Sequence, residues 1–167
     1  MPFQPILRFA PSPNGLLHLG HAYSALHTWR AAAQLGGIAL LRIEDIDITR
    51  CKPEFADAIF EDLHWLGLDW PEPVWRQSDR FAAYAEAAEQ LRGMGLLYPC
   101  FCTRTAVAAH ASGCDPEDAP LYDGTCRHLS GADIATRLER NEPVQYRLDM
   151  ARAIAMTGPL SFTLVGP

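Results

Sequence analysis

Two histidines three residues apart are the first side chains of this sequence that could do chemistry. His18 and His21 enclose Gly20 in the run His-Leu-Gly-His. On a helix this spacing places both imidazoles on one face, where they could hold a nucleotide phosphate as charge builds on it. Gly20 would let a flat base approach the backbone. A lone pair of this kind can also be an incidental metal-competent pair, or have no function.

A strand and a turn precede the histidines and would position them. The apolar segment 6–10 predicts a buried strand, and the Pro- and Gly-punctuated run 11–15 predicts a turn. A helical pattern then extends from His18 to Leu35, where a Gly-Gly pair ends it. Open α/β sheets bind ligands at the carboxyl ends of strands, and helix N-termini suit phosphate. We therefore predict a nucleotide site where this strand meets the helix.

Strands and helices continue to alternate along the chain. Pro53 suits the first turn of a second helix, which Gly67 would end, and Ser78 could cap a third helix that runs to Met94. The other predicted elements are strands at 38–43 and 96–101 and a short helix at 103–110. This order predicts an α/β fold with a Rossmann-like, doubly wound parallel sheet.

Composition limits the class of protein. The 167 residues, 49% hydrophobic and 20% charged, are typical of one globular domain and not of a disordered tail. A net charge of -6 argues against a protein that is basic throughout, but tRNA binding needs only a local basic surface. The sequence contains neither an apolar run of membrane-span length nor a signal-peptide pattern. We expect a cytoplasmic monomer without a membrane partner.

Cysteines gather late in the sequence in a pattern typical of metal sites. The five cysteines are an odd number, which suits thiols or a metal better than a disulfide framework. Cys100 and Cys102 form a close pair, and Cys126 returns across a loop as a third soft ligand. Ordinary thiols are the alternative, which is the interpretation we favour for Cys51.

The fourth ligand is open on chemical grounds alone. Cys114, His128 and His110 all have suitable donor atoms near the cluster. A tyrosine would be a poor choice, because a phenol ionises only near pH ~10.

The residues around the histidine pair resemble a known family. The run Arg-Phe-Ala-Pro-Ser-Pro-Asn-Gly begins at Arg8 and leads directly into His-Leu-Gly-His. It resembles the glutamate branch of the class I aminoacyl-tRNA synthetases, whose HIGH element lies there. The run Leu-Arg-Ile-Glu-Asp-Ile-Asp, which contains Glu44, is similar to the RIED strand end of that family. The resemblance covers Arg8 to Cys126 and extends more loosely to Arg147.

The resemblance implies a reaction and a glutamate site. L-glutamate and ATP would form glutamyl-adenylate, and the glutamyl group would pass to a tRNA hydroxyl. Arg8 would hold the side-chain carboxylate of glutamate, and Glu44 its ammonium. The implied glutamate-binding residues are Arg8, Phe9, Ala10, Pro11, Ser12 and Glu44. Without this context, Arg8 and Glu44 would be interpreted as an ion pair between adjacent strands.

The resemblance also implies an ATP site. His18, Gly20 and His21 would face ATP, with the two histidines as catalytic residues that act through positioning and charge stabilisation. Mg²⁺ would accompany ATP. Asp45 and Asp47 could assist it, although exposed carboxylates at strand ends usually face solvent.

The cysteine region resembles one branch of the same family. Cys-x-Cys followed by Tyr-Asp-Gly-x-Cys is similar to the zinc element of the glutamyl-queuosine tRNA(Asp) synthetases, in which the tyrosine is a ligand. The resemblance implies one structural Zn²⁺ held by Cys100, Cys102, Tyr122 and Cys126, because four filled positions leave no place for a metal-bound water. A bound zinc ion can lower the pKa of an oxygen acid enough to permit this.

That branch also implies an acceptor and a division of the chain. The acceptor would be queuosine in the anticodon of tRNA(Asp). The expected parts are a nucleotide- and glutamate-binding half (1–99), a zinc-binding insertion (100–128) and a shortened continuation of the catalytic domain (129–167).

Two other functions remain open. The chain could be the front of a glutamyl-tRNA synthetase that charges tRNA(Glu), or a non-catalytic, zinc-bearing binding module. Class I synthetases carry a lysine-rich KMSKS loop after the zinc region, whereas Lys52 is the only lysine here. We therefore expect a fragment of a longer enzyme or a truncated relative.

Overall fold

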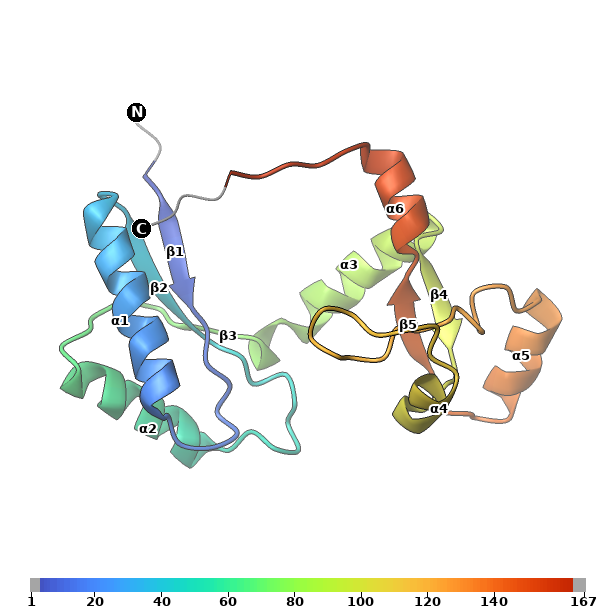
Figure 1. Cartoon of the computed structure of the whole chain (residues 1–167). Helices are drawn as coiled ribbons and strands as arrows, with labels where there is room; N and C mark the ends of the chain where they lie inside the picture. The colour runs from blue at the N-terminus through green and yellow to red at the C-terminus, as the bar shows by residue number, and fades with distance from the viewer. Residues whose placement is uncertain (1–3, 164–167) are drawn as a thin grey trace. The chain divides into compact units, whose positions relative to one another are not determined.

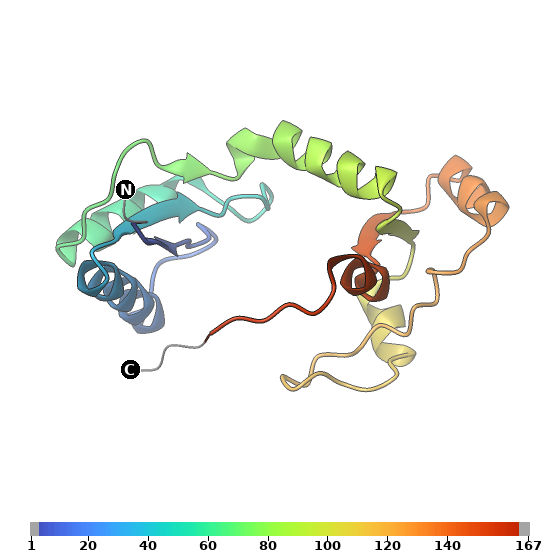
Figure 2. The ribbon, with the colours of Figure 1, turned by 90° about the horizontal axis from the view of Figure 1, so that it is seen from above.

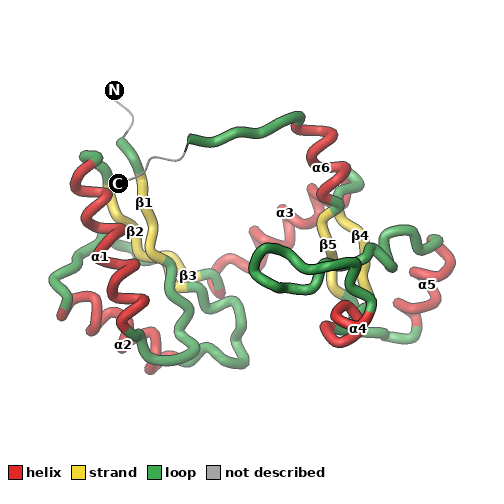
Figure 3. Tube along the Cα trace, viewed as in Figure 1, coloured by secondary structure: helices red, strands yellow, loops and turns green. Residues whose placement is uncertain are grey.

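The computed structural model describes residues 4–163 (Figures 1 and 2). The chain divides into two compact units, Met1–Tyr84 and Ala85–Pro167. Each unit has its own sheet, which is parallel in the first and antiparallel in the second (Figure 3).

Three parallel strands form the sheet of the first unit, in the order β1-β2-β3. β1 (Ile6–Phe9) pairs with β2 (Ile38–Ile43), and β2 pairs with the short β3 (Trp75–Arg76). The connections are α1 (Leu19–Gln34) and α2 (Pro53–Trp65). This alternation confirms the predicted α/β fold with a parallel sheet.

Local signals set the ends of the two helices as predicted. α1 ends before Gly36, whose φ of 61° is a left-handed conformation that glycine adopts without strain. Pro53 begins α2, where its missing N–H costs nothing, and Gly67 with a φ of 74° follows the end of that helix.

One face of the parallel sheet is packed against both helices, and the other face is open. Buried and partly exposed residues alternate along β2, so the buried ones share a face. The core cluster comprises Phe9, Ala25, Leu41, Ile43, Ile59, Leu63 and Leu68. Because it includes residues of both α1 and α2, the two helices cover the same face. Arg8 and Arg42 alternate with these buried positions and therefore belong to the open face.

The third predicted helix begins later than predicted, and Ser78 does not cap it. Ser78 starts a short 3-10 turn, η1 (Ser78–Arg80), and α3 spans Phe81–Gly93. The Ser78 hydroxyl donates instead to the Asp45 carboxylate at 2.7 Å. The capping prediction was wrong because the Ser78 hydroxyl binds the carboxylate of Asp45 instead. Asp45 is distant in sequence, so no local pattern reveals this contact.

The strand predicted at 96–101 exists but lies outside the parallel sheet. It forms β4 (Leu97–Cys100), which pairs antiparallel with β5 (Gln145–Leu148). The sequence did not predict β5, so β4 was assigned to the preceding alternation of strands and helices. A four-residue strand carries no local information about its partner, and the pairing is fixed only by the folded unit.

Three short helices complete the second unit. α4 (Arg104–Ala109) confirms the predicted short helix, and the Thr103 side chain caps it. α5 (Gly131–Glu139) and α6 (Met150–Thr157) were not predicted. None of these three helices contains a buried residue. Across residues 4–163, no helix combines the length and apolar character that crossing a bilayer requires.

Candidate functional site

The two predicted histidines lie at the start of α1, and both rings cap it. His18 is the N-cap residue, and its Nδ1 accepts a hydrogen bond from the Gly20 N–H at 3.1 Å. The Nδ1 of His21 accepts from the His18 N–H at 3.3 Å. Since each Nδ1 is an acceptor, the proton of each neutral ring is on Nε2. The ring centroids are 3.9 Å apart, so the two imidazoles lie side by side at the start of the helix.

The electrostatics of this helix end favour an anion. The first turn of α1 contains no acidic residue, so nothing opposes the positive end of the helix dipole. Burial, with a smaller contribution from His18, lowers the pKa of His21. His21 is therefore neutral at pH 7 and offers a hydrogen bond rather than a full charge.

Gly20 makes room for the His18 ring. A Cβ at position 20 would lie 3.0 Å from Cε1 of His18 and 3.2 Å from its Nδ1. A larger residue would therefore push the imidazole away from the helix end. That Gly20 lets a base approach the backbone stays a prediction. The structure adds a steric reason for glycine at this position.

A groove on the open face of the parallel sheet contains two arginines. It has a volume of 490 Å³, and its lining includes Arg8, Leu40, Arg42 and Trp75. Two guanidinium groups in one groove suit a ligand with carboxylates. Arg8 was predicted for this role and Arg42 was not, although it is the one charged residue in an otherwise apolar strand. A single charged residue in an apolar strand was the signal that could have identified Arg42.

Glu44 is paired within its own strand end. Its carboxylate forms an ion pair with Arg42, so the alternative of an Arg8–Glu44 pair between strands is wrong. The Nε of Arg42 is buried and has no hydrogen-bond partner among the described atoms. A cationic ligand group at Glu44 would have to compete with this guanidinium.

Backbone hydrogen bonds join the two predicted glutamate-binding segments. The Glu44 N–H donates to the Pro11 carbonyl at 2.9 Å, which places Glu44 beside the turn that holds Ser12. Ser12 is exposed and Ala10 is half-buried. The Phe9 side chain is 6% exposed and belongs to the core cluster. Only the backbone of Phe9 could therefore contribute to a ligand site in the groove.

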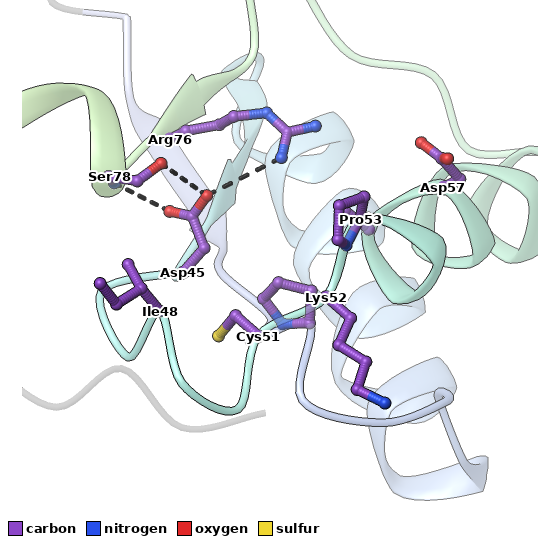
Figure 4. Close-up of a pocket in the computed structure, with 10 residues that line it drawn as sticks. Asp45, Ile48, Cys51, Lys52, Pro53, Asp57, Arg76 and Ser78 are labelled. Atoms are coloured by element: carbon purple, nitrogen blue, oxygen red, sulfur yellow. Dashed lines mark hydrogen bonds and ion pairs between the residues drawn. The ribbon is translucent and has the colours of Figure 1, made fainter.

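A smaller pocket of 220 Å³ surrounds the loop that follows β2 (Figure 4). In it, Asp45 accepts hydrogen bonds from the N–H and hydroxyl of Ser78, at 2.9 and 2.7 Å, and lies 3.8 Å from the Arg76 guanidinium. Burial opposes ionisation of Asp45, but the Ser78 hydrogen bonds and Arg76 lower its pKa overall. Because its oxygens are occupied, Asp45 ties the end of β2 to η1. Burial raises the pKa of Cys51, which lines the same pocket as an ordinary thiol.

Three cysteines of the second unit converge on one point. The sulfurs of Cys100, Cys102 and Cys126 lie within 4.8 Å of one another. Cys100 ends β4, and the other two thiols come from the loops that follow. Among the His, Cys, Asp and Glu residues of 4–163, this is the group close enough to share a metal ion. The alternatives Cys114, His128 and His110 lie outside it.

The Tyr122 hydroxyl completes the cluster. Its oxygen lies 3.4 Å from the Cys100 sulfur and 3.9 Å from the Cys102 sulfur, and the Cys102 and Cys126 sulfurs are 3.5 Å apart. Zinc ligands at a tetrahedral angle place two sulfurs about 3.8 Å apart, and a sulfur and an oxygen about 3.5 Å apart. The three distances among these atoms are close to the values that the predicted zinc site requires. The Tyr122 oxygen also accepts the Cys126 N–H at 2.7 Å.

The thiols of the cluster differ in their tendency to ionise. Burial works against the Cys100 thiolate, but hydrogen bonds with Tyr122 and Arg147 outweigh it and lower the Cys100 pKa to about 6. Burial and the Cys126 hydrogen bond raise the Cys102 pKa to about 11. Burial and Cys100 likewise raise the pKa of Tyr122. The surroundings thus favour ionisation of Cys100 and oppose ionisation of Cys102 and Tyr122.

The sequence is similar to known synthetases over most of its length. Residues 6–164 match the family described as tRNA synthetases class I (E and Q), catalytic domain. A glutamate–tRNA ligase from Geobacter sulfurreducens is 47% identical over 128 residues, which are 76% of this chain and 28% of the relative. A glutamyl-Q tRNA(Asp) synthetase from Rhodobacter capsulatus is 48% identical over 128 residues, which are 73% of this chain and 46% of the relative. The chain thus spans less than half of either relative.

The fold agrees with this similarity. A crystal structure of glutamate–tRNA synthetase from Elizabethkingia anophelis is similar with a TM-score of 0.68 and 29% identity, covering 89% of this chain and 33% of that one. The HIGH-type helix start, the RIED-type strand end and the parallel sheet all lie within the matched residues. The chain therefore belongs to the catalytic-domain family of the class I tRNA synthetases (E and Q).

Proposed function

We propose that this chain provides the glutamate-activating part of an ATP-dependent ligase that transfers glutamate to tRNA. The observation that carries the proposal is the pair of imidazoles, of His18 and His21, at the start of α1, whose first turn contains no acidic residue. Their position at the carboxyl end of the parallel strands is where α/β sheets bind nucleotides.

The proposed first step forms an acyl phosphate. A carboxylate oxygen of glutamate bonds to the α-phosphorus of ATP, and the bond from that phosphorus to the pyrophosphate oxygen breaks. Negative charge grows on the phosphoryl oxygens as this happens. The two imidazoles and the positive end of the α1 dipole would stabilise that charge without giving up a proton. Mg²⁺ bound with ATP would offset the charge of the triphosphate.

Arg8, which lines the groove, and Glu44, which follows β2, would hold the amino acid. Arg8 would bind the side-chain carboxylate of glutamate, and Glu44 would bind its ammonium. To do so, the ammonium replaces the Arg42 guanidinium that pairs with Glu44 in the structure. An amino acid without the second carboxylate would leave Arg8 unpaired, which disfavours glutamine.

We further propose that the acceptor is queuosine in tRNA(Asp). Relatives of both kinds are similar at almost equal identity, so overall similarity does not separate the two acceptors. The proposal is supported by the zinc element, in which Tyr122 is the fourth donor beside three cysteines. The cyclopentenediol of queuosine and the terminal ribose of a tRNA both offer diol hydroxyls, so the same glutamyl-adenylate could serve either. In this proposal 1–99 binds the substrates, 100–128 binds zinc, and 129–167 continues the catalytic domain.

Transfer of radiolabelled glutamate by the full-length gene product to purified tRNAs tests this proposal. We expect label on tRNA(Asp) that contains queuosine, and none on tRNA(Asp) without queuosine or on tRNA(Glu). Glu44→Gln is the control, since it should abolish labelling. Label on tRNA(Glu) would support the alternative synthetase. Failure to form any glutamyl-adenylate would support the non-catalytic binding module.

A further inference from the structure

Arg147 lies directly against the cysteine cluster. It belongs to β5, opposite Tyr98 of β4. Its guanidinium carbon is 4.1 Å from the centroid of the Tyr122 ring. The Arg147 guanidinium therefore lies against the ring of one of the four donor residues.

Arg147 has no carboxylate partner among residues 4–163, although it is partly buried. Arg42, Arg92 and Arg137 each form an ion pair with a glutamate, whereas Arg147 forms none with the described acidic residues. The Nε atom of Arg147 is buried and lacks a hydrogen-bond partner among the described atoms. A partly buried cation without a counter-ion is costly unless its neighbours carry negative charge.

The charge of the donor set explains this placement. Three thiolates and one phenolate carry four negative charges, and Zn²⁺ offsets two of them. The remaining negative charge would lie in a largely buried site, where an adjacent cation stabilises it strongly. The Tyr122 ring contact adds a cation–π attraction to this effect.

We infer that Arg147 is a positioning residue that balances the charge of the zinc site formed by Cys100, Cys102, Tyr122 and Cys126. The inference rests on the zinc site proposed above. Neighbouring residues that bond to metal ligands typically change metal affinity by about 10- to 100-fold when they are removed.

Two other arginines provide matched controls. Arg92 lies over the Tyr146 ring at 4.4 Å, a similar stack that involves no donor of the cluster. Arg127 directly follows a donor residue in sequence, but it is exposed and lies over Tyr98 at 5.8 Å. Removing either cation changes the net charge of the protein by the same amount as removing Arg147.

The test is zinc affinity of this chain, measured by competition with a chromophoric chelator at pH 7. We expect Arg147→Met to weaken zinc binding roughly 10- to 100-fold, with Arg147→Lys losing less than that because it keeps the charge. Arg92→Met and Arg127→Met should bind as the unaltered chain does. Circular dichroism checks the fold of each variant, and the visible spectrum of the Co²⁺ form shows whether the thiolates still bind.

The outcomes separate the inference from the site on which it rests. If the unaltered chain binds no zinc, the zinc site itself is wrong. If it binds one zinc ion and Arg147→Met binds equally tightly, the role of Arg147 is wrong and the site stands. Should Arg147→Met fail to fold, Arg147→Lys is compared with Arg147→Gln. Equal affinities of those two variants would overturn charge balance.

Discussion

The two units of the chain hold their candidate sites by different means. In the first unit, an apolar cluster from β1, β2, α1 and α2 fixes the strand ends and the start of α1. In the second unit, the buried apolar side chains among the described residues are Leu96, Cys100 and Cys126. Two of these three are donors of the proposed zinc site. The first unit is thus organised around a conventional core, whereas the interior of the second unit is the cysteine cluster.

This difference bears on how each site tolerates change. A core of this size keeps its strand ends in place without any ligand, so the histidines and the groove are preformed. Small units with little apolar core usually depend on metals or disulfides for stability. The second unit contains free cysteines and no disulfide among its described residues. A bound metal ion is therefore the source of stability that we expect for this unit. We therefore expect the two units to respond independently to metal removal and to core mutations.

Metal removal should have the largest effect. We expect chelation of zinc, or Cys100→Ser combined with Cys126→Ser, to unfold the second unit and leave the first folded. Hydrogen exchange would then show protection in β4 and β5 falling by roughly 100-fold or more, because binding energy at a structural zinc site is folding energy. Protection in β1 and β2 should not change. Retained protection in β4 and β5 without metal would contradict the claim that the second unit, unlike the first, depends on zinc.

A core truncation should give the reverse pattern. Leu63 is fully buried in the first unit, and Leu63→Ala should lower the free energy of unfolding of that unit by about 3 kcal/mol. Zinc affinity should stay the same. The control is Leu26→Ala, since Leu26 is 44% exposed on α1 and its loss should cost less than about 1 kcal/mol. Denaturant unfolding measures both variants, and weaker zinc binding by Leu63→Ala would show that the units are coupled.

Loss of the Asp45 hydrogen bond should have a smaller effect that depends on pH. Because the pKa of Asp45 is lowered in the folded state, its contribution to stability is present above the unfolded pKa and is lost as pH falls through the folded value. Ser78→Ala should therefore reduce the free energy of unfolding by about 2 kcal/mol at pH 7, and by less at a pH below the folded pKa of Asp45, where the carboxyl group of the unaltered protein is also protonated. An equal loss at both pH values would show that Asp45 ionisation is not involved. Ser112→Ala, at an exposed serine of the second unit, is the control.

Features with local causes could be predicted from the sequence, and features that depend on distant partners could not. The ends of α1 and α2 follow from Gly36, Pro53 and Gly67, whose backbone preferences act on adjacent residues. In contrast, the antiparallel pairing of β4 with β5 joins segments that are far apart in sequence.

The same division applies to the candidate sites. Spacing identified the three cysteines, and the family resemblance added Tyr122, which the structure brings to the cluster. The partners of Glu44 and Asp45 were missed because a charged side chain has many possible partners until the fold places one beside it. Arg147 was missed for the same reason, since it lies on a strand that the sequence did not predict.

The most direct test of the proposed chemistry is glutamate-dependent exchange of pyrophosphate into ATP, catalysed by the full-length gene product without tRNA. We predict exchange with L-glutamate and not with L-glutamine or L-aspartate. Glu44→Gln and Arg8→Met should each lower kcat/KM by about 100-fold or more, because each leaves a substrate charge unpaired. Absence of exchange, or normal exchange by either variant at unchanged stability, would contradict the account.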